Sequence, residues 1–395
     1  MYRLTGKIQH YAWGGNTFIP ELLSVENPEN KPFAEYWMGT HPGGPSQVWL
    51  NETAWTGLPE LIHSDPKKYL GDKVISLFGG FPYLLKVLDV KDMLSIQVHP
   101  NKVEAEKGFA RENQQGVPLD APHRNYKDNN HKPEMMIALS EFWLLHGFSP
   151  ALHEILDNHE IFNTLLPVFE AKGIQGLYQY VMELPQEGVD GMLKPLAEKV
   201  VPLYEAGKLS KDSPDFWAGR VMSSSKPEYK NLDRGIFSIY FFNIVHLQPG
   251  QAIFQGAGMP HAYLEGQNIE LMSNSDNVLR AGLTPKHIDV PELLKHTVFE
   301  ITHPQVLNGE KKGPLLTFHC PVPDFIIHKI ELDKGEAFMA HAHGPEIIIA
   351  TEGDLHWQGN GDLTTHKGEA VYVLPGETYT IMANSPAVLF KAAVP

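Results

Sequence analysis

The sequence predicts a mainly β protein in which two jelly-roll barrels accompany an inserted helical domain. Short apolar runs divided by turn sequences fill roughly the first 145 residues and the chain from about residue 302, as in a barrel or double-sheet jelly roll. In the middle, apolar residues recur at three- and four-residue steps, the spacing typical of helices. We therefore expect one barrel from residues 1–148 and 229–300, a helical insert over 149–228, and a second, degenerate barrel over 301–395.

Individual elements follow from local patterns. In the first β region, 81–90 and 93–98 are predicted strands separated by the polar pair Lys91-Asp92. Prolines and glycines divide the insert into several short helices. The aromatic and β-branched run 237–247 predicts a buried strand. Strands in the last region are expected at 325–330, 346–350, 370–374 and 379–382.

Composition limits the classes of partner. The chain has 395 residues, with 32 Lys and Arg against 47 Asp and Glu, a net charge of −15. This charge disfavours nucleic acid and anionic membranes, which need basic surface. The sequence has no apolar run of membrane-spanning length, and its first residues lack the apolar core of a secretory signal. The single cysteine, Cys320, excludes an intrachain disulfide and fits a reducing compartment. We expect a cytoplasmic monomer whose partner is a small molecule, not nucleic acid or a membrane.

Two donor side chains lie close together in the second predicted strand. Because side chains alternate along a strand, Gln97 and His99 point to one face together with Ser95. Ile96 and Val98 point to the other, apolar face. Two donors on one strand face suit a metal site, although the polar inner wall of a barrel without metal would look the same.

Two further donors come later in the chain. Pro133 has no amide hydrogen and is expected at the start of a strand, which places Glu134 at the strand mouth. Gly256 and Gly258 precede His261, and glycines allow the close backbone approach that would bring this histidine into a barrel. In isolation, Glu134 could equally be an ordinary loop carboxylate.

Taken in order, these four residues resemble the metal ligands of cupin barrels. Gln97, His99, Glu134 and His261 fill the four places, with glutamine where a second histidine is more usual. Two imidazoles, a carboxylate and an amide oxygen, without sulfur, are acceptable to zinc. Affinity ordering alone leaves iron, manganese and cobalt open. We predict one zinc ion per chain, held in a cupin-type jelly roll.

Longer blocks of sequence resemble the type I mannose-6-phosphate isomerase family. They follow the family order and span most of the chain, and the last of them is long and specific. The blocks are residues 9–14, 35–41, 94–100, 131–134, 261–264 and 275–286. This resemblance implies a cytoplasmic, zinc-dependent aldose–ketose isomerase that interconverts mannose 6-phosphate and fructose 6-phosphate.

Such a reaction moves a proton between C1 and C2 through a cis-enediol, so it needs a base and groups that stabilise charge on oxygen. Arg280 is the favoured catalytic residue that is not a metal ligand, because arginine binds oxyanions and phosphate with two hydrogen bonds. Lys132, two residues before Glu134, and Glu270, nine residues after His261, are rival candidates for the base. We expect His131 to assist ring opening or to cap a loop. Asp276 is a third possible base, and is more simply interpreted as a residue that orients Arg280.

A small anionic substrate also needs local positive charge in this acidic protein. We predict a phosphate pocket of Lys86, Ser95 and Lys286, with ordinary ion pairs as the alternative for the lysines. The pair His341 and His343 is interpreted as structural, because no fourth ligand follows in that barrel. Two other functions remain open from sequence: a cupin oxidoreductase that uses iron and O₂, and a regulatory cupin that binds a sugar phosphate without turnover.

Overall fold

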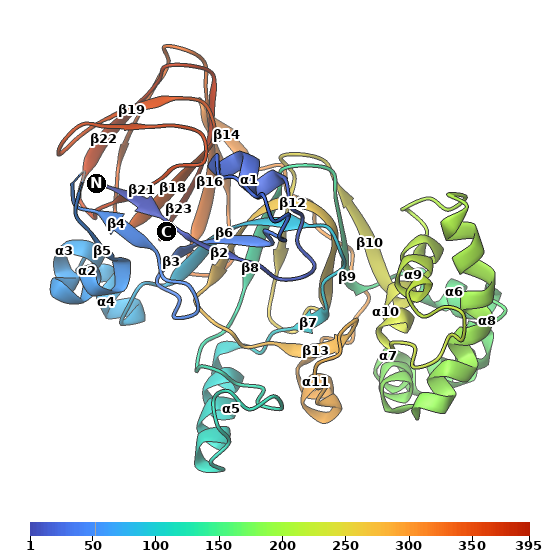
Figure 1. The fold of residues 1–395 in the computed structure, drawn as a ribbon. Helices are drawn as coiled ribbons and strands as arrows, with labels where there is room; N and C mark the ends of the chain where they lie inside the picture. The colour runs from blue at the N-terminus through green and yellow to red at the C-terminus, as the bar shows by residue number, and fades with distance from the viewer. Residues whose placement is uncertain (52) are drawn as a thin grey trace.

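The structure is a computed structural model that describes residues 1–51 and 53–395. Figure 1 shows two groups of strands side by side, with a bundle of helices at the end of the molecule away from the C-terminal strands. The predicted fold class is therefore confirmed: the protein is mainly β, in two cupin-like halves, with an added helical region. Within the described ranges, no helix combines the length and the hydrophobicity needed to cross a membrane.

The first barrel is built on a ten-stranded sheet with the main path β10-β9-β12-β6-β3-β2. Its strands are β2 (Lys7–Gln9), β3 (Glu35–Gly39), β6 (Tyr83–Val90), β7 (Ile96–Val98), β8 (Glu134–Ala138), β9 (Phe142–Phe148), β10 (Phe242–Leu247), β11 (Ala252–Gln255), β12 (His261–Ser273) and β13 (Leu279–Gly282). The 13-residue strand β12 pairs with β6, β7, β8 and β9. One long strand therefore borders much of the barrel interior.

Helices cover one side of this barrel. They are α6 (Leu152–Asn158), the 3₁₀ helix η1 (Phe162–Leu165), α7 (Leu166–Glu183), α8 (Gln186–Glu205), α9 (Pro214–Ser223) and α10 (Gly235–Phe241). Their buried side chains, such as Leu177 and Trp217, share one apolar cluster with Ile96 and Val98 of β7. Because this face of β7 packs toward the helices, Gln97 between them is turned to the barrel interior.

The C-terminal half combines a nine-stranded sheet, ordered β14-β15-β16-β23-β18-β21-β1-β4-β5, with a four-stranded sheet, ordered β17-β22-β19-β20. The strands are β1 (Tyr2–Thr5), β4 (Gln47–Trp49), β5 (Trp55–Gly57), β14 (Glu310–Lys312), β15 (Leu315–Phe318), β16 (Ile326–Leu332), β17 (Ala337–His341), β18 (Glu346–Glu352), β19 (Leu355–Gln358), β20 (Leu363–Thr365), β21 (Ala370–Val373), β22 (Thr378–Ala383) and β23 (Ala387–Ala393). The four strands predicted from sequence correspond to β16, β18, β21 and β22 to within two residues at each end.

The remaining helices lie around the two barrels: α1 (Phe18–Leu23), α2 (Leu58–Ser64), α3 (Pro66–Leu70), α4 (Asp72–Phe78), α5 (Lys102–Gln114) and α11 (Val290–His296). In Figure 1, α11 lies next to β13, and α5 lies beyond β7 on the same side of the first barrel. Arg111 of α5 pairs with Glu292 of α11 at 3.0 Å, so these two helices support each other beside that end of the barrel.

Two details differ from the sequence predictions. The run 237–247 is not one strand, because residues up to Phe241 form α10 and only Phe242–Leu247 form β10. Every residue of α10 is buried, so its mostly apolar sequence shows no helical period that would separate it from a strand. In addition, β1 pairs with β21, which makes residues 2–5 part of the C-terminal sheet. The other domain boundaries stay predictions.

Candidate metal centre and active site

Strand register brings several polar side chains onto one wall of the first barrel. In the pairing of β12 with β7, His261 lies opposite Gln97, and in the pairing of β7 with β13, Gln97 lies opposite Arg280. Residues directly opposite each other in an antiparallel pair point to the same face. His261, Gln97 and Arg280 therefore form a row across three neighbouring strands.

Three of the four predicted ligands meet in this interior. His99, Glu134 and His261 each offer a ligand atom, and these atoms all lie within 4.8 Å of one another. The Nε2 atom of His261 is 3.2 Å from one oxygen of Glu134, and the Nε2 atom of His99 is 3.5 Å from the other. All three side chains are buried. The carboxylate thus lies between two imidazoles.

The protonation of the imidazoles makes this cluster suited to a cation. His99 Nδ1 donates to the carbonyl oxygen of Asn277 at 2.8 Å, and His261 Nδ1 donates to that of Met259 at 2.9 Å. This leaves the Nε2 lone pairs directed toward Glu134, and burial lowers the pKa of His99 to about 4, so this ring is neutral. Lone pairs that face a carboxylate repel it unless a cation lies between them. Histidine metal ligands commonly have their second nitrogen fixed by a carbonyl in this way.

A small cavity of about 60 Å³ adjoins the cluster. It is lined by the side chains of two lysines and three glutamates, together with Gln97 and His261: Lys86, Lys132, Glu35, Glu134 and Glu270. Two positive charges against three negative ones give a formal balance of 2 − 3 = −1. A divalent cation would reverse this sign, so the charge of the cavity also fits a metal. The cavity has room for a few atoms only.

Comparison with known proteins identifies the family. Residues 1–151 match the family model for the type I phosphomannose isomerase catalytic domain. The chain is 37% identical over 387 residues to the mannose-6-phosphate isomerase of Escherichia coli (strain K12), covering 96% of each chain. It is 36% identical over 368 residues to the Homo sapiens enzyme, covering 84% of this chain and 82% of the human one.

The chain belongs to the type I phosphomannose isomerase family. Its fold agrees with a crystal structure of a variant phosphomannose isomerase from Salmonella typhimurium, at a TM-score of 0.87 and 33% identity over 100% of this chain and 99% of the other. A zinc-bound mannose 6-phosphate isomerase matches with a TM-score of 0.85 and 33% identity, again over 100% and 99% of the two chains. The family resemblance predicted from sequence is confirmed.

In this phosphomannose isomerase family member, Lys86 is held by two carboxylates. Its Nζ atom is 2.9 Å from Glu270 and 3.6 Å from Glu35, and all three side chains are buried. Burial by itself would lower the pKa of Lys86, but the carboxylates of Glu270, Glu35 and Glu134 outweigh it and raise the pKa. The lysine stays charged and fully paired. Its predicted place in a phosphate pocket stays a prediction, and in the structure it lies against Glu270 and Glu35.

Lys132 is the second interior lysine, and its Nζ atom is 3.0 Å from Glu134. Burial would raise the pKa of Glu134, but the ammonium of Lys132 outweighs this and keeps the pKa well below its usual range. Glu134 is therefore an ionised carboxylate, as a metal ligand must be. The prediction that Lys132 lies beside the metal cluster agrees with this geometry.

Arg280 lies close enough to Lys127 and Lys286 for its charge to act on both. Burial lowers the pKa of each lysine most, Arg280 lowers both further, and Arg124 also lowers the pKa of Lys127. Within residues 1–51 and 53–395, none of the three makes an ion pair with a carboxylate. Lys127 donates to the carbonyl oxygens of Leu119 and Ala121 at 2.6 and 3.3 Å. Positive charge without acidic partners is uncommon in a protein of net charge −15, and suits an anion.

Two predicted residues do not take their expected places. Asp276 pairs with His41 at 3.2 Å and not with Arg280, so it does not orient the guanidinium. His131 points away from the metal cluster, and its Nε2 atom is 2.9 Å from Asp324 in the C-terminal half, which leaves ring opening without geometric support. Ser95 lies just before β7, outside the lining of the 60 Å³ cavity, and its place in the phosphate pocket stays a prediction.

Sequence reasoning missed two polar residues of the cavity. Glu35 approaches Lys86 and also accepts a hydrogen bond from the indole of Trp37. Tyr263 has a buried hydroxyl with no hydrogen-bond partner among the described residues, and burial together with Glu270 and Glu134 raises its pKa well above the usual range. Tyr263 could have been found, because it lies two residues after His261 on a strand and so shares its face.

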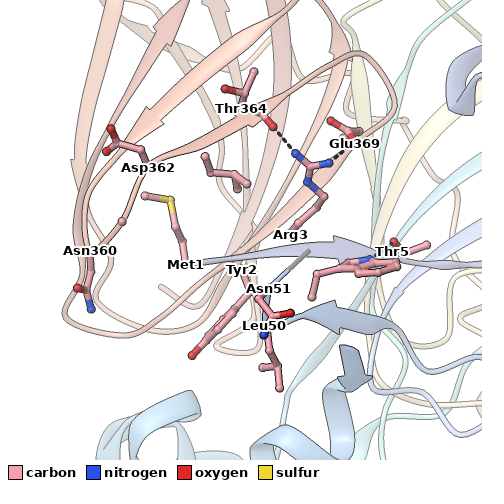
Figure 2. Close-up of a pocket in the computed structure, with 13 residues that line it drawn as sticks. Met1, Tyr2, Arg3, Thr5, Leu50, Asn51, Asn360, Asp362, Thr364 and Glu369 are labelled. Carbon is pink, nitrogen blue, oxygen red and sulfur yellow. Dashed lines mark hydrogen bonds and ion pairs between the residues drawn. The ribbon is translucent and has the colours of Figure 1, made fainter. Parts of the chain in front are cut away.

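Two other places were considered and do not form comparable sites. His341 and His343 are exposed, and the described residues contain no metal cluster at either of them. A larger cavity of about 860 Å³ lies at the edge of the C-terminal sheet, where Arg3 bonds Glu369 at 3.1 Å and the carbonyl oxygen of Thr364 at 2.6 Å (Figure 2). Its arginine is already paired, in contrast to Arg280.

Proposed function

We propose that the protein interconverts mannose 6-phosphate and fructose 6-phosphate, with one zinc ion held by Gln97, His99, Glu134 and His261. The observation that carries this proposal is the pair of imidazole Nε2 atoms directed at one buried carboxylate, within a chain of the phosphomannose isomerase family. A zinc ion bound there would supply Lewis-acid polarisation of the sugar oxygens. Gln97 joins the ligand set because its side chain lines the same cavity as Glu134 and His261.

Glu270 is the proposed proton carrier. Its carboxylate lines the cavity, and the ammonium of Lys86 holds it in place at 2.9 Å. In the proposed step, the carboxylate takes the proton from C2 while the C2 hydroxyl proton moves to the C1 oxygen, which gives the cis-enediolate with its negative charge on the C2 oxygen. The carboxylic acid then returns its proton to C1. Lys132 is less suited to this task because its ammonium already pairs with Glu134.

The cluster of Arg280, Lys286 and Lys127 is the proposed phosphate site. These cations have no carboxylate partners in the described part of the chain, and a phosphate monoester carries nearly two negative charges near neutral pH. The 60 Å³ cavity beside the metal cluster admits only the C1–C2 end of the sugar, so the phosphate has to bind outside it. The register of Arg280 with Gln97 places these two sites next to each other.

The activity is tested with a coupled assay on mannose 6-phosphate, run before and after treatment with a chelator and again after zinc is restored. We expect activity that disappears with the chelator and returns with zinc. Absence of turnover after zinc repletion would refute the isomerase and would favour a regulatory sugar-phosphate binder. Oxygen consumption dependent on iron would favour an oxidoreductase instead.

The identity of the base is tested by solvent tritium exchange at C2. We expect Glu270→Gln to reduce exchange by about 100-fold or more, since general-base catalysis contributes 10²–10⁴-fold, because the amide cannot accept the proton. Lys132→Met is the matched comparison, and we expect it to retain measurable exchange. Wild-type exchange rates in Glu270→Gln would contradict this assignment.

We further propose that the protein acts as a monomer in the cytoplasm. The single cysteine fits the reducing conditions of the cytoplasm, and the net charge of −15 disfavours polyanionic partners. Size-exclusion chromatography with light scattering would test the monomer. A mass near twice the 44.3 kDa of the chain would contradict it.

A further inference from the structure

We propose that Asp324, a residue of the C-terminal half, is a positioning residue for the active site of the first barrel. The inference rests on the proposed isomerase function. Asp324 lies two residues before the start of β16, next to Phe325, which is fully buried in the apolar cluster between the two halves. Its own side chain is 3% exposed. A carboxylate so deeply buried at an interface between the two halves needs a reason to be there.

The carboxylate joins two segments of the first barrel. Its Oδ1 atom accepts a hydrogen bond from Ser273 Oγ at 2.8 Å and is 2.9 Å from Nε2 of His131. His131 precedes β8, and Ser273 is the last residue of β12. The two segments also bond each other directly, since the Ser273 amide donates to the carbonyl oxygen of Pro133 at 3.2 Å.

Active-site residues lie on the opposite side of these same segments. Lys132 and Glu134 follow His131 and face the metal cluster, while Glu270 lies three residues before Ser273. Because side chains alternate along β12, Glu270 and Met272 point into the barrel while Ser273 points out of it, toward the C-terminal half. Tyr83, the register partner of Ser273, agrees with this direction, because its hydroxyl bonds the carbonyl oxygens of Pro345 and Ala392.

Asp324 therefore holds two segments from the side that faces the C-terminal half. One segment carries the proposed metal ligand Glu134, and the other carries the proposed base Glu270. In the register of β8 with β12, Glu134 lies opposite Met272, one residue from Ser273. A displacement of this junction would change the distance between Glu270 and Glu134, and small misplacements of reacting groups reduce rates strongly. The bonds of Asp324 hold both segments at one atom.

The second carboxylate oxygen supports a role other than stability. Oδ2 of Asp324 is buried and has no hydrogen-bond partner in the described part of the chain. Burial of a polar atom without a partner opposes folding, so this oxygen adds nothing to stability. A side chain kept under these conditions is better explained by the two residues that its other oxygen holds.

The test compares Asp324→Ala and Asp324→Asn in the zinc-loaded full-length protein. We expect Asp324→Ala to lower kcat by about 10- to 100-fold with KM changed less than about threefold, since the phosphate site lies on other segments. Zinc content should stay at the wild-type level. Asp324→Asn keeps an acceptor oxygen for Ser273 and His131, so we expect it to restore kcat to within about threefold of wild type.

Glu346→Gln is the matched control, because Glu346 is equally buried in the C-terminal half but bonds only Lys391 and Tyr379. We expect it to change thermal stability but not kcat. Wild-type kcat in Asp324→Ala, a loss that merely follows lost zinc, or an Asn variant as impaired as the Ala variant would each overturn the inference. A wild-type protein without activity on mannose 6-phosphate would instead refute the proposed function, and this inference with it.

Discussion

The inner faces of the two barrels differ in how their polar groups are satisfied. In the C-terminal barrel the interior is mostly apolar, formed by side chains such as Trp357, Ile381 and Leu389. The buried carboxylate of Glu346 in this barrel is fully matched: one oxygen lies 3.2 Å from the buried Lys391, and the other accepts from Tyr379 at 2.6 Å. The scaffold alone thus requires no ligand.

The first barrel has polar atoms that the protein itself does not satisfy. Among the described residues, His99 Nε2 and the Tyr263 hydroxyl are buried without hydrogen-bond partners, and Arg280 has no acidic partner. Buried groups of this kind oppose folding unless something else pairs with them. The comparison shows that the mark of the site is polar groups without hydrogen-bond or ion-pair partners. The number of polar residues is a weaker sign.

The strongest test of this contrast replaces one histidine in each barrel by alanine and compares the two variants. We expect His99→Ala to reduce kcat/KM by about 1000-fold or more, because loss of a ligand removes metal chemistry worth several kcal/mol. His343→Ala, in the exposed pair of the C-terminal barrel, should leave activity within about twofold. Steady-state assays and zinc analysis of both proteins are the measurements. Equal losses in the two variants would contradict the assignment of the metal to the first barrel.

A second test replaces one cation in each barrel, Lys391 in the C-terminal barrel and Arg280 in the first. Lys391→Met leaves Glu346 buried without its counter-charge, so we expect about 3 kcal/mol lower stability with activity unchanged. Arg280→Met should do the reverse, with kcat/KM reduced by about 100-fold and stability changed by less than about 0.5 kcal/mol. Urea unfolding and kinetics on the same preparations separate the two. Loss of stability in Arg280→Met would show that its charge is paired after all.

A smaller effect is expected from pH. Burial, with the positive charge of Lys391, lowers the pKa of His328 to about 3, against 6.5 in an unfolded chain. Between these values the unfolded state binds a proton that the folded state does not, so stability is complete above pH 6.5 and falls as pH decreases. At pH 5 the loss is at most about 2 kcal/mol. Unfolding of His328→Gln should lack this part of the pH dependence, whereas His343→Gln should keep it.

Local sequence patterns were sufficient for much of the fold and for the metal cluster. Alternation placed Gln97 on one face of β7 and Ile96 on the other, and the structure packs Ile96 against the helices. The proline before Glu134 correctly predicted the start of β8. These features depend on a few adjacent residues, so they can be derived from one sequence.

Features set by long-range register could not be derived in this way. Lys86 and Glu270 are 184 residues apart, and only the pairing of β6 with β12 shows that they form an ion pair. The direction of His131 likewise depends on Asp324, 193 residues later. The strand predicted over 237–247 is only partly present for another reason, because the mostly apolar first half of this run carries no period that separates helix from strand.

The pairing of β1 with β21 has a consequence for synthesis of the chain. Arg3 and Glu369, whose side chains form an ion pair beside this pairing, are 366 positions apart. During translation, β21 is therefore completed about twenty to seventy seconds after residues 2–5 at usual elongation rates of 5–20 residues per second. In that interval the edge of β1 that later binds β21 is open to other chains. Residues 2–5 therefore gain β4 as a neighbour early and β21 only much later.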